Sequence, residues 1–172
     1  MQKETIRKRV EALREWMSRE HLDAFIFPST DPHNGEYVPD HWKGREWVSG
    51  FNGSAGTAVV TADSAALWTD SRYFIAAQEQ LEGTGFELMR ERIPGTPDIP
   101  EWLDSQWDDK PRRVGVDGMV CCHDMVDDLA HDLELRGIQL VTDLDPLELV
   151  WKDRPPIPQH PVVVHPMEYA GE

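Results

Sequence analysis

The residues best suited to metal chemistry lie together in a polar stretch near the N-terminus. Asp31, His33, Glu36 and His41 could supply carboxylate oxygens and imidazole nitrogens to a divalent ion. Their spacing matches neither the HExxH pattern nor the paired CxxC motifs of standard metal sites. Because acidic sequences bring such residues together by chance, we expect no metal ion to bind in this loop.

The chain offers no comparable pattern for nucleophilic catalysis. Cys122 and His123 are adjacent, so in a helix or a strand their side chains point in different directions. No set of serine, histidine and aspartate carries the nucleophile-elbow signature of a hydrolase. We therefore predict that this chain catalyses no reaction by itself.

Three glycines, Gly50, Gly53 and Gly56, invite comparison with a phosphate-binding loop. The spacing is GxxGxxG, the Lys-Ser/Thr pair of a nucleoside-triphosphate loop is missing, and a β-compatible run follows in place of a helix. Tight turning and close backbone approach account for these glycines better. We expect their role to be architectural.

Arg72 lies where a buried strand is predicted to end and a helix to begin. Thr69, Asp70 and Ser71 are suitable N-caps, which places Arg72 in the first helical turn, where the helix dipole disfavours a cation. A residue that breaks a local rule is a functional candidate, and this type of junction faces the edge where α/β folds bind ligands. The alternative is a surface arginine paired with Asp70 or Glu36. The residues alone leave both interpretations open.

The elements that must position these residues alternate between helix and strand. Helices are predicted over residues 3–20, around 46, 71–81, 98–107, 123–135 and 147–151, and strands over 24–27, 57–61, 65–68, 86–91, 114–116 and 138–141. Three turn residues separate the strands at 57–61 and 65–68, which predicts a hairpin. The pattern indicates an α/β fold with a mixed β-sheet flanked by helices.

The composition excludes several classes of partner. The chain has 172 residues, 40% of them hydrophobic, and a net charge of -15, so it should fold and should repel nucleic acids and anionic membrane surfaces. We find no signal peptide pattern and no apolar run long enough to span a bilayer. The two cysteines, Cys121 and Cys122, are adjacent and cannot readily bridge each other, which favours a reducing cytoplasm.

The C-terminal part departs from the alternating pattern. Residues 153–161 contain four prolines, which cannot donate backbone hydrogen bonds or continue a helix, so this stretch is predicted to be a stiff linker. The eleven residues that follow are too few to fold alone. We predict an α/β domain over residues 1–152, with a proline-rich linker and the start of a truncated second domain over residues 153–172.

Several motifs together indicate a family resemblance. In order along nearly the whole chain are STDPHNGEYV, GFNGSAGTAVVT, LWTDSRYF, RVGVD and LVWKDRPPIP. Together they resemble the N-terminal domain of cytosolic-type Xaa-Pro aminopeptidase, or aminopeptidase P. The closing PVVVHPMEYAGE looks like the start of the second domain in three-domain members. The resemblance implies the creatinase N-terminal fold, a ribonuclease H-like mixed sheet flanked by helices.

The resemblance also implies an activity for a longer parent protein. Such enzymes remove an N-terminal residue when proline follows it. Their third domain binds two divalent ions, usually manganese, through two aspartates, a histidine and two glutamates, and a metal-bound hydroxide attacks the scissile carbonyl. None of these ligands can be located in this chain, which would hold no cofactor itself. The implied partners are peptides with proline at the second position, the other domains of the same chain and a second copy in a homodimer.

Within that family the arginine of the TDxRYF motif contacts substrate, and Arg72 is the matching residue. A planar, permanently charged guanidinium can hold a peptide carbonyl or a terminal carboxylate through two hydrogen bonds. Two other functions remain open. One is a non-enzymatic peptide- or protein-binding module related to histone-chaperone N-terminal domains, and the other is the N-terminal domain of a prolidase or creatinase relative.

Overall fold

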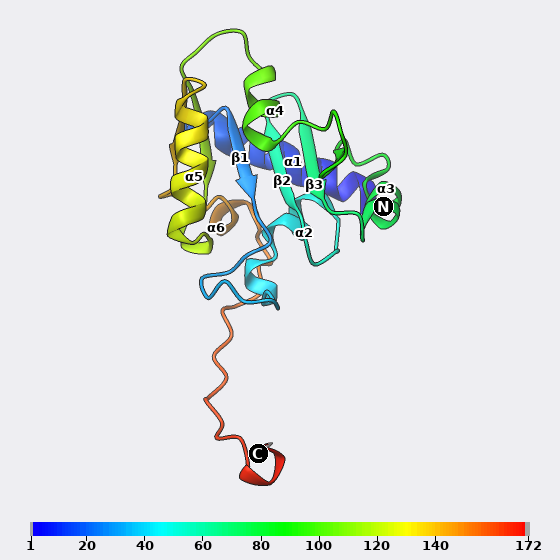
Figure 1. Cartoon of the computed structure of the whole chain (residues 1–172), viewed down its shortest axis with the longest axis vertical. Coiled ribbons are helices and arrows are strands. Elements are labelled where there is room, and N and C mark those ends of the chain that lie inside the picture. Colours follow the sequence, from blue (N-terminus) through cyan, green and yellow to red (C-terminus); the bar gives the residue numbers. More distant parts are fainter. Residues whose placement is uncertain (1, 171–172) are drawn as a thin grey trace.

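A six-stranded mixed sheet forms the centre of the molecule, and the computed structural model describes residues 2–170 around it (Figure 1). The strand order is β4-β3-β2-β1-β5-β6. The strands are β1 (Ala24–Phe27), β2 (Thr57–Thr61), β3 (Ala65–Thr69), β4 (Glu87–Arg90), β5 (Arg112–Val116) and β6 (Ile138–Val141). Strand β2 is antiparallel to β1 and β3, whereas the other neighbours pair in parallel. The predicted hairpin and mixed sheet are therefore confirmed.

Helices cover both faces of the sheet. They are α1 (Gln2–Arg19), α2 (Gly44–Ser49), α3 (Phe74–Leu81), α4 (Ile99–Ser105), α5 (His123–Glu134) and α6 (Leu147–Val150), with 3-10 turns at Asp40–Trp42, Gly118–Val120 and Met167–Tyr169. Figure 1 shows α1 passing behind the strands, while α4 and α5 lie in front of them. No helix among residues 2–170 is both long and apolar enough to cross a membrane.

Two hydrophobic clusters form because strand side chains alternate between the faces. Phe25 and Phe27 of β1 pack in the cluster with α1, whereas Ile26 packs in the cluster with α4 and α5. Every residue of β1 and β3 is buried, which explains why these two strands are nearly continuous apolar runs in the sequence. Helix α1 contributes the buried side chains that its helical spacing predicts: Ile6, Val10, Leu13 and Met17.

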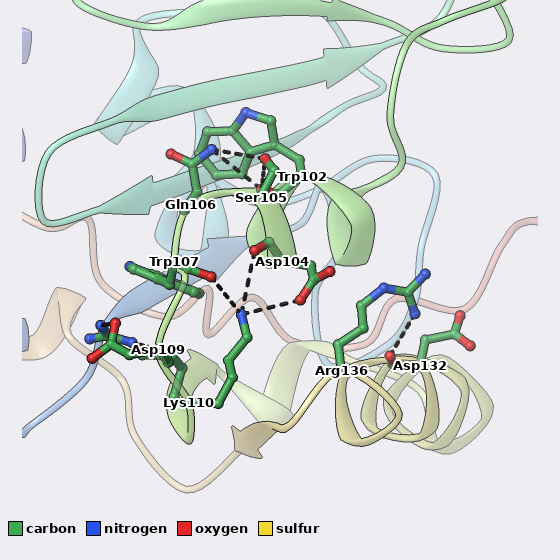
Figure 2. A network of polar contacts seen from close by, with 10 residues as sticks. Trp102, Asp104, Ser105, Gln106, Trp107, Asp109, Lys110, Asp132 and Arg136 are labelled. Carbon is green, nitrogen blue, oxygen red and sulfur yellow. Dashed lines mark hydrogen bonds and ion pairs between the residues drawn. The ribbon is translucent and has the colours of Figure 1, made fainter.

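All strands except β2 run in the same direction, so their carboxyl ends meet at one edge of the sheet, called here the carboxyl edge. At the opposite edge, the loop before β5 is tied to α4. The Lys110 ammonium contacts the Asp104 carboxylate at 3.2 Å and donates to the carbonyls of Asp104 and Trp107 (Figure 2). It thereby contacts the backbone of Asp104 in the last turn of α4 and that of Trp107, two residues after the helix ends.

The first residues after α6 are attached to the domain. Arg154 donates from Nε to the His41 carbonyl at 2.9 Å and pairs with Asp145 at 2.5 Å. His41 Nδ1 lies 2.6 Å from the Pro155 carbonyl, and Trp151 stacks on Trp47. Residues 156–170 are exposed and extend away from the sheet (Figure 1).

Candidate functional site

Arg72 lies at the carboxyl edge, in a turn between β3 and α3. The Asp70 carboxylate accepts hydrogen bonds from the backbone nitrogen and Nε of Arg72 at 3.0 and 2.9 Å, and from Nη2 at 2.7 Å. The backbone nitrogen of Tyr73 donates to the Asp70 carbonyl at 3.0 Å. These bonds close a turn, because an aspartate side chain competes with helix formation for nearby N–H groups.

The predicted start of α3 is therefore wrong. The helix begins at Phe74 rather than near Ser71, and its N-cap is Tyr73, which makes no side-chain cap. Arg72 precedes the helix, so the argument from the helix dipole does not apply to it. Its position at the junction of a strand and a helix is confirmed.

Of the two ion-pair partners expected for Arg72, the structure contains Asp70. Hydrogen bonds from the guanidinium lower the pKa of Asp70 to about 2, so the carboxylate stays charged through the neutral and mildly acidic range. The Arg72 side chain is nevertheless 67% exposed. Of its five N–H donors, those on Nη1 have no acceptor among the described residues. The guanidinium can therefore bind Asp70 and a ligand at the same time.

A buried arginine fixes the backbone of residues 50–56, called here the glycine turn, which lies near Arg72. Arg45 of α2 donates from Nη1 to the Phe51 carbonyl at 2.8 Å and from Nη2 to the Gly53 carbonyl. Its Cζ lies 4.9 Å from the centre of the Phe51 ring, and burial lowers the pKa of Arg45 to about 10. The guanidinium is still charged at neutral pH. Sequence reasoning missed this residue, whose only signal is its helical spacing from the apolar Val48.

The glycine turn is in turn connected to the segment that carries Arg72. Ser54 Oγ lies 2.6 Å from the Tyr73 hydroxyl. Asn52 and Gln80 exchange two hydrogen bonds, of 3.0 and 2.9 Å, between the turn and α3. Residues 50–56 and 70–80 therefore form one hydrogen-bonded unit at the carboxyl edge.

The architectural role predicted for the glycines is confirmed. Gly50 ends α2 in the left-handed conformation, with φ of 78°. A Cβ atom on Gly53 would overlap the Phe51 ring, and one on Gly56 would lie 2.6 Å from the Trp68 carbonyl oxygen. The backbone thus approaches its neighbours too closely for a side chain.

A pocket of about 310 Å³ opens between the glycine turn and the loop after β1. This volume lies at the lower end of the range of small-ligand sites. Ser54, which bonds to Tyr73, belongs to its wall. The wall consists of Pro28, Ser29, Glu36, Tyr37, Val38, Trp42, Lys43, Arg45, Glu46, Asn52, Gly53 and Ser54.

The four candidate ligands of the polar loop have separate surroundings. The buried Asp31 carboxylate accepts from the backbone nitrogens of His33 and Gly35 at 3.0 and 3.1 Å, which folds the loop. Glu36 lines the pocket, and His41 contacts the Pro155 carbonyl. Within residues 2–170, no three metal-ligating side chains gather in one place.

Comparison with known proteins gives a consistent result. The profile of the Creatinase/Prolidase N-terminal domain family matches residues 9–148. Xaa-Pro aminopeptidase 1 of Dictyostelium discoideum is 38% identical over 167 residues, which cover 94% of this chain and 26% of the relative. Xaa-Pro aminopeptidase 2 of Homo sapiens is 39% identical, and the match covers 93% of this chain and 23% of the relative. The chain thus spans about a quarter of the length of such relatives.

Solved structures have the same fold. An X-prolyl aminopeptidase from Caenorhabditis elegans, described as a cytosolic enzyme with a di-nuclear active site, superposes with a TM-score of 0.85 and 31% identity; the match covers 95% of this chain and 28% of that one. The N-terminal domain of the cytoplasmic peptidase PepQ from Mycobacterium tuberculosis superposes with a TM-score of 0.61 and 27% identity, over 83% and 98% of the two chains. This chain belongs to the Creatinase/Prolidase N-terminal domain family.

Proposed function

We propose that this chain is the N-terminal, non-catalytic domain of a metal-dependent Xaa-Pro aminopeptidase. The similarity to the C. elegans enzyme over 95% of the chain is the main support, together with relatives that are about four times longer. The parent protein would be a cytoplasmic hydrolase that cleaves the bond between an N-terminal residue and a following proline. It would act as a homodimer, with residues 1–152 as its first domain and residues 153–172 leading into its second.

The metal ions of such an enzyme do not fit the described part of this chain, because no three ligating side chains gather there. We therefore assign two divalent ions, of which manganese is the expected identity, to the region that would follow residue 172. Burial raises the pKa of the Cys121 thiol to about 11, which disfavours a nucleophilic role for this residue. The contribution of this chain is then to bind and orient the substrate.

Arg72 is the residue proposed to contact the substrate. It is exposed at the carboxyl edge, it has donors left after pairing with Asp70, and Tyr73 links it to the wall of the 310 Å³ pocket. These donors would hold a peptide carbonyl or a terminal carboxylate. A non-enzymatic peptide-binding module would use the same donors. A measurement of aminopeptidase activity in the parent protein therefore has to distinguish the enzyme from the binding module.

Replacing Arg72 in the parent enzyme should reduce activity. We expect Arg72→Ala to lower kcat/KM for an Xaa-Pro peptide by at least about tenfold, or roughly 1.4 kcal/mol of transition-state stabilisation. Arg72→Lys should be intermediate, because lysine keeps the charge and loses the fork. Steady-state kinetics measures both effects, with Arg7→Ala on the exposed side of α1 as the control. A change below about twofold, roughly 0.4 kcal/mol, would contradict the assignment.

The 172-residue chain alone gives a second test. We expect it to fold, because its own residues form two buried hydrophobic clusters, and to release no amino acid from an Xaa-Pro peptide, even with excess manganese. Circular dichroism and an amino-acid release assay measure the two properties. Metal-dependent turnover that disappears in Asp31→Ala or His33→Ala would place a catalytic centre in the polar loop and overturn this proposal.

A further inference from the structure

The guanidinium of Arg72 is held along one edge. Nε and Nη2 contact separate oxygens of the Asp70 carboxylate, at 2.9 and 2.7 Å. This parallel pair of bonds fixes the plane of the guanidinium as well as its position. The edge that carries Nη1 faces away from Asp70 and keeps its donors.

Asp70 is itself attached to the core of the sheet. It follows Thr69, the last residue of β3, which is fully buried and donates from Oγ1 to the Ala55 carbonyl at 2.7 Å. The Thr69 carbonyl accepts from the backbone nitrogen of Glu91 at 3.0 Å. The Asp70 carboxylate, which aligns Arg72, is therefore attached to a buried and hydrogen-bonded part of the backbone.

Tyr73 holds the face of the same guanidinium. Its ring centre lies 5.2 Å from Arg72 Cζ, within the range of a cation–π contact. The ring packs edge-on against the buried Phe51, with centres 5.9 Å apart, and its hydroxyl lies 2.6 Å from Ser54 Oγ. The ring thus has one fixed position between the glycine turn and Arg72.

An exposed arginine normally samples many rotamers and loses this freedom when it binds a ligand. A side chain that is already ordered in its binding geometry avoids part of that cost. We propose that Asp70 and Tyr73 are positioning residues, which align Arg72 so that its Nη1 edge meets a carbonyl or carboxylate oxygen of the substrate. This inference rests on the proposed function of Arg72.

A double-mutant cycle in the parent enzyme tests the inference. Asp70→Asn removes the charge that aligns Arg72, and Tyr73→Phe removes the bond to Ser54. Each should raise KM for an Xaa-Pro peptide at least about threefold, with a smaller effect on kcat, because alignment acts on binding. In the Arg72→Ala background the same substitutions should change kcat/KM by less than about twofold, since they act through Arg72. Asp128→Asn, at an exposed position on α5, is the matched control.

The outcomes separate this inference from the proposed function. If Arg72→Ala has no effect, the proposed function fails. If Arg72→Ala reduces activity while Asp70→Asn and Tyr73→Phe retain it, only the positioning role is wrong. Effects of Asp70→Asn that persist unchanged in the Arg72→Ala background would also overturn it, because they would be independent of Arg72.

A readout without activity checks the contact that fixes the Tyr73 ring. The hydrogen bond with Ser54 lowers the pKa of the Tyr73 phenol below its ordinary value, and Arg72 adds to this. In the 172-residue chain with Tyr37→Phe and Tyr169→Phe, Tyr73 is the only tyrosine left to titrate. Absorbance at alkaline pH should then show a higher pKa after Ser54→Ala and an unchanged one after Ser105→Ala. An unchanged pKa in Ser54→Ala would show that Ser54 does not hold the Tyr73 hydroxyl, and it would overturn the positioning role of Tyr73.

Discussion

Replacing Phe51 by alanine should lower the free energy of unfolding by about 3–5 kcal/mol, the range for a large aromatic side chain lost from a core. Phe51 is fully buried and follows Gly50, the first residue of the glycine turn. Its ring packs against the Arg45 guanidinium on one side and against Tyr73 on another. Alanine would leave a cavity beside a buried charge, and the neighbouring backbone, which Arg45 holds through two carbonyls, has little freedom to fill it.

Urea denaturation followed by tryptophan fluorescence measures this loss. Ile75→Ala is the matched control, since Ile75 is 80% exposed and its truncation should change stability by less than about 0.5 kcal/mol. Phe51→Leu should fall between the two, because it restores part of the volume. A loss below about 1 kcal/mol in Phe51→Ala would mean that the turn collapses around the missing ring.

Gly56→Ala should destabilise the protein by about 3 kcal/mol, through steric overlap and backbone strain together. The new Cβ atom would lie 2.6 Å from the Trp68 carbonyl oxygen, and the φ angle of 153° is unfavourable for a residue with a side chain. Neither the backbone of Gly56 nor that of Trp68 can move away easily to relieve this overlap. Trp68 is paired with Thr57 in the sheet, and the Gly56 carbonyl accepts a hydrogen bond from Ser29 at 2.5 Å.

The control for this substitution is Gly35→Ala. Gly35 is exposed and does not need a left-handed conformation, and a Cβ atom added there would lie 3.9 Å from the Asp31 carboxylate oxygens, at ordinary contact distance. This variant should unfold at nearly the same urea concentration as the unmodified chain. If Gly56→Ala also unfolds at nearly the same urea concentration as the unmodified chain, the close approach between the glycine turn and β3 does not constrain the fold.

The sequence is sufficient to predict most of the framework. Residues 24–27, 57–61 and 138–141 are short apolar runs between turns, and each is a strand with the predicted bounds. The helical spacing of Ile6, Val10 and Leu13 predicts α1 to within a residue at each end. These elements follow from periodic burial, which depends on neighbours in the sequence.

The site is less predictable because its contacts join residues that are distant in the sequence. The bond from Ser54 to Tyr73 and the exchange between Asn52 and Gln80 have no local pattern. The start of α3 is wrong for a related reason: Asp70 is a good N-cap by type, yet its carboxylate also binds the side chain of Arg72, which produces a turn. Arg45 illustrates a third case, a charged side chain that is buried although charged residues are usually exposed.

The attachment of Arg154 and Pro155 to His41 determines where a following domain could pivot. Since both residues are bonded to His41, the chain leaves the α/β fold after Pro155 rather than at the end of α6. A following domain that rotates about residues 156 onward would change its orientation relative to the sheet, while Arg72 keeps its place on the carboxyl edge. In the proposed parent enzyme, this attachment would limit the angles at which the catalytic region can approach Arg72.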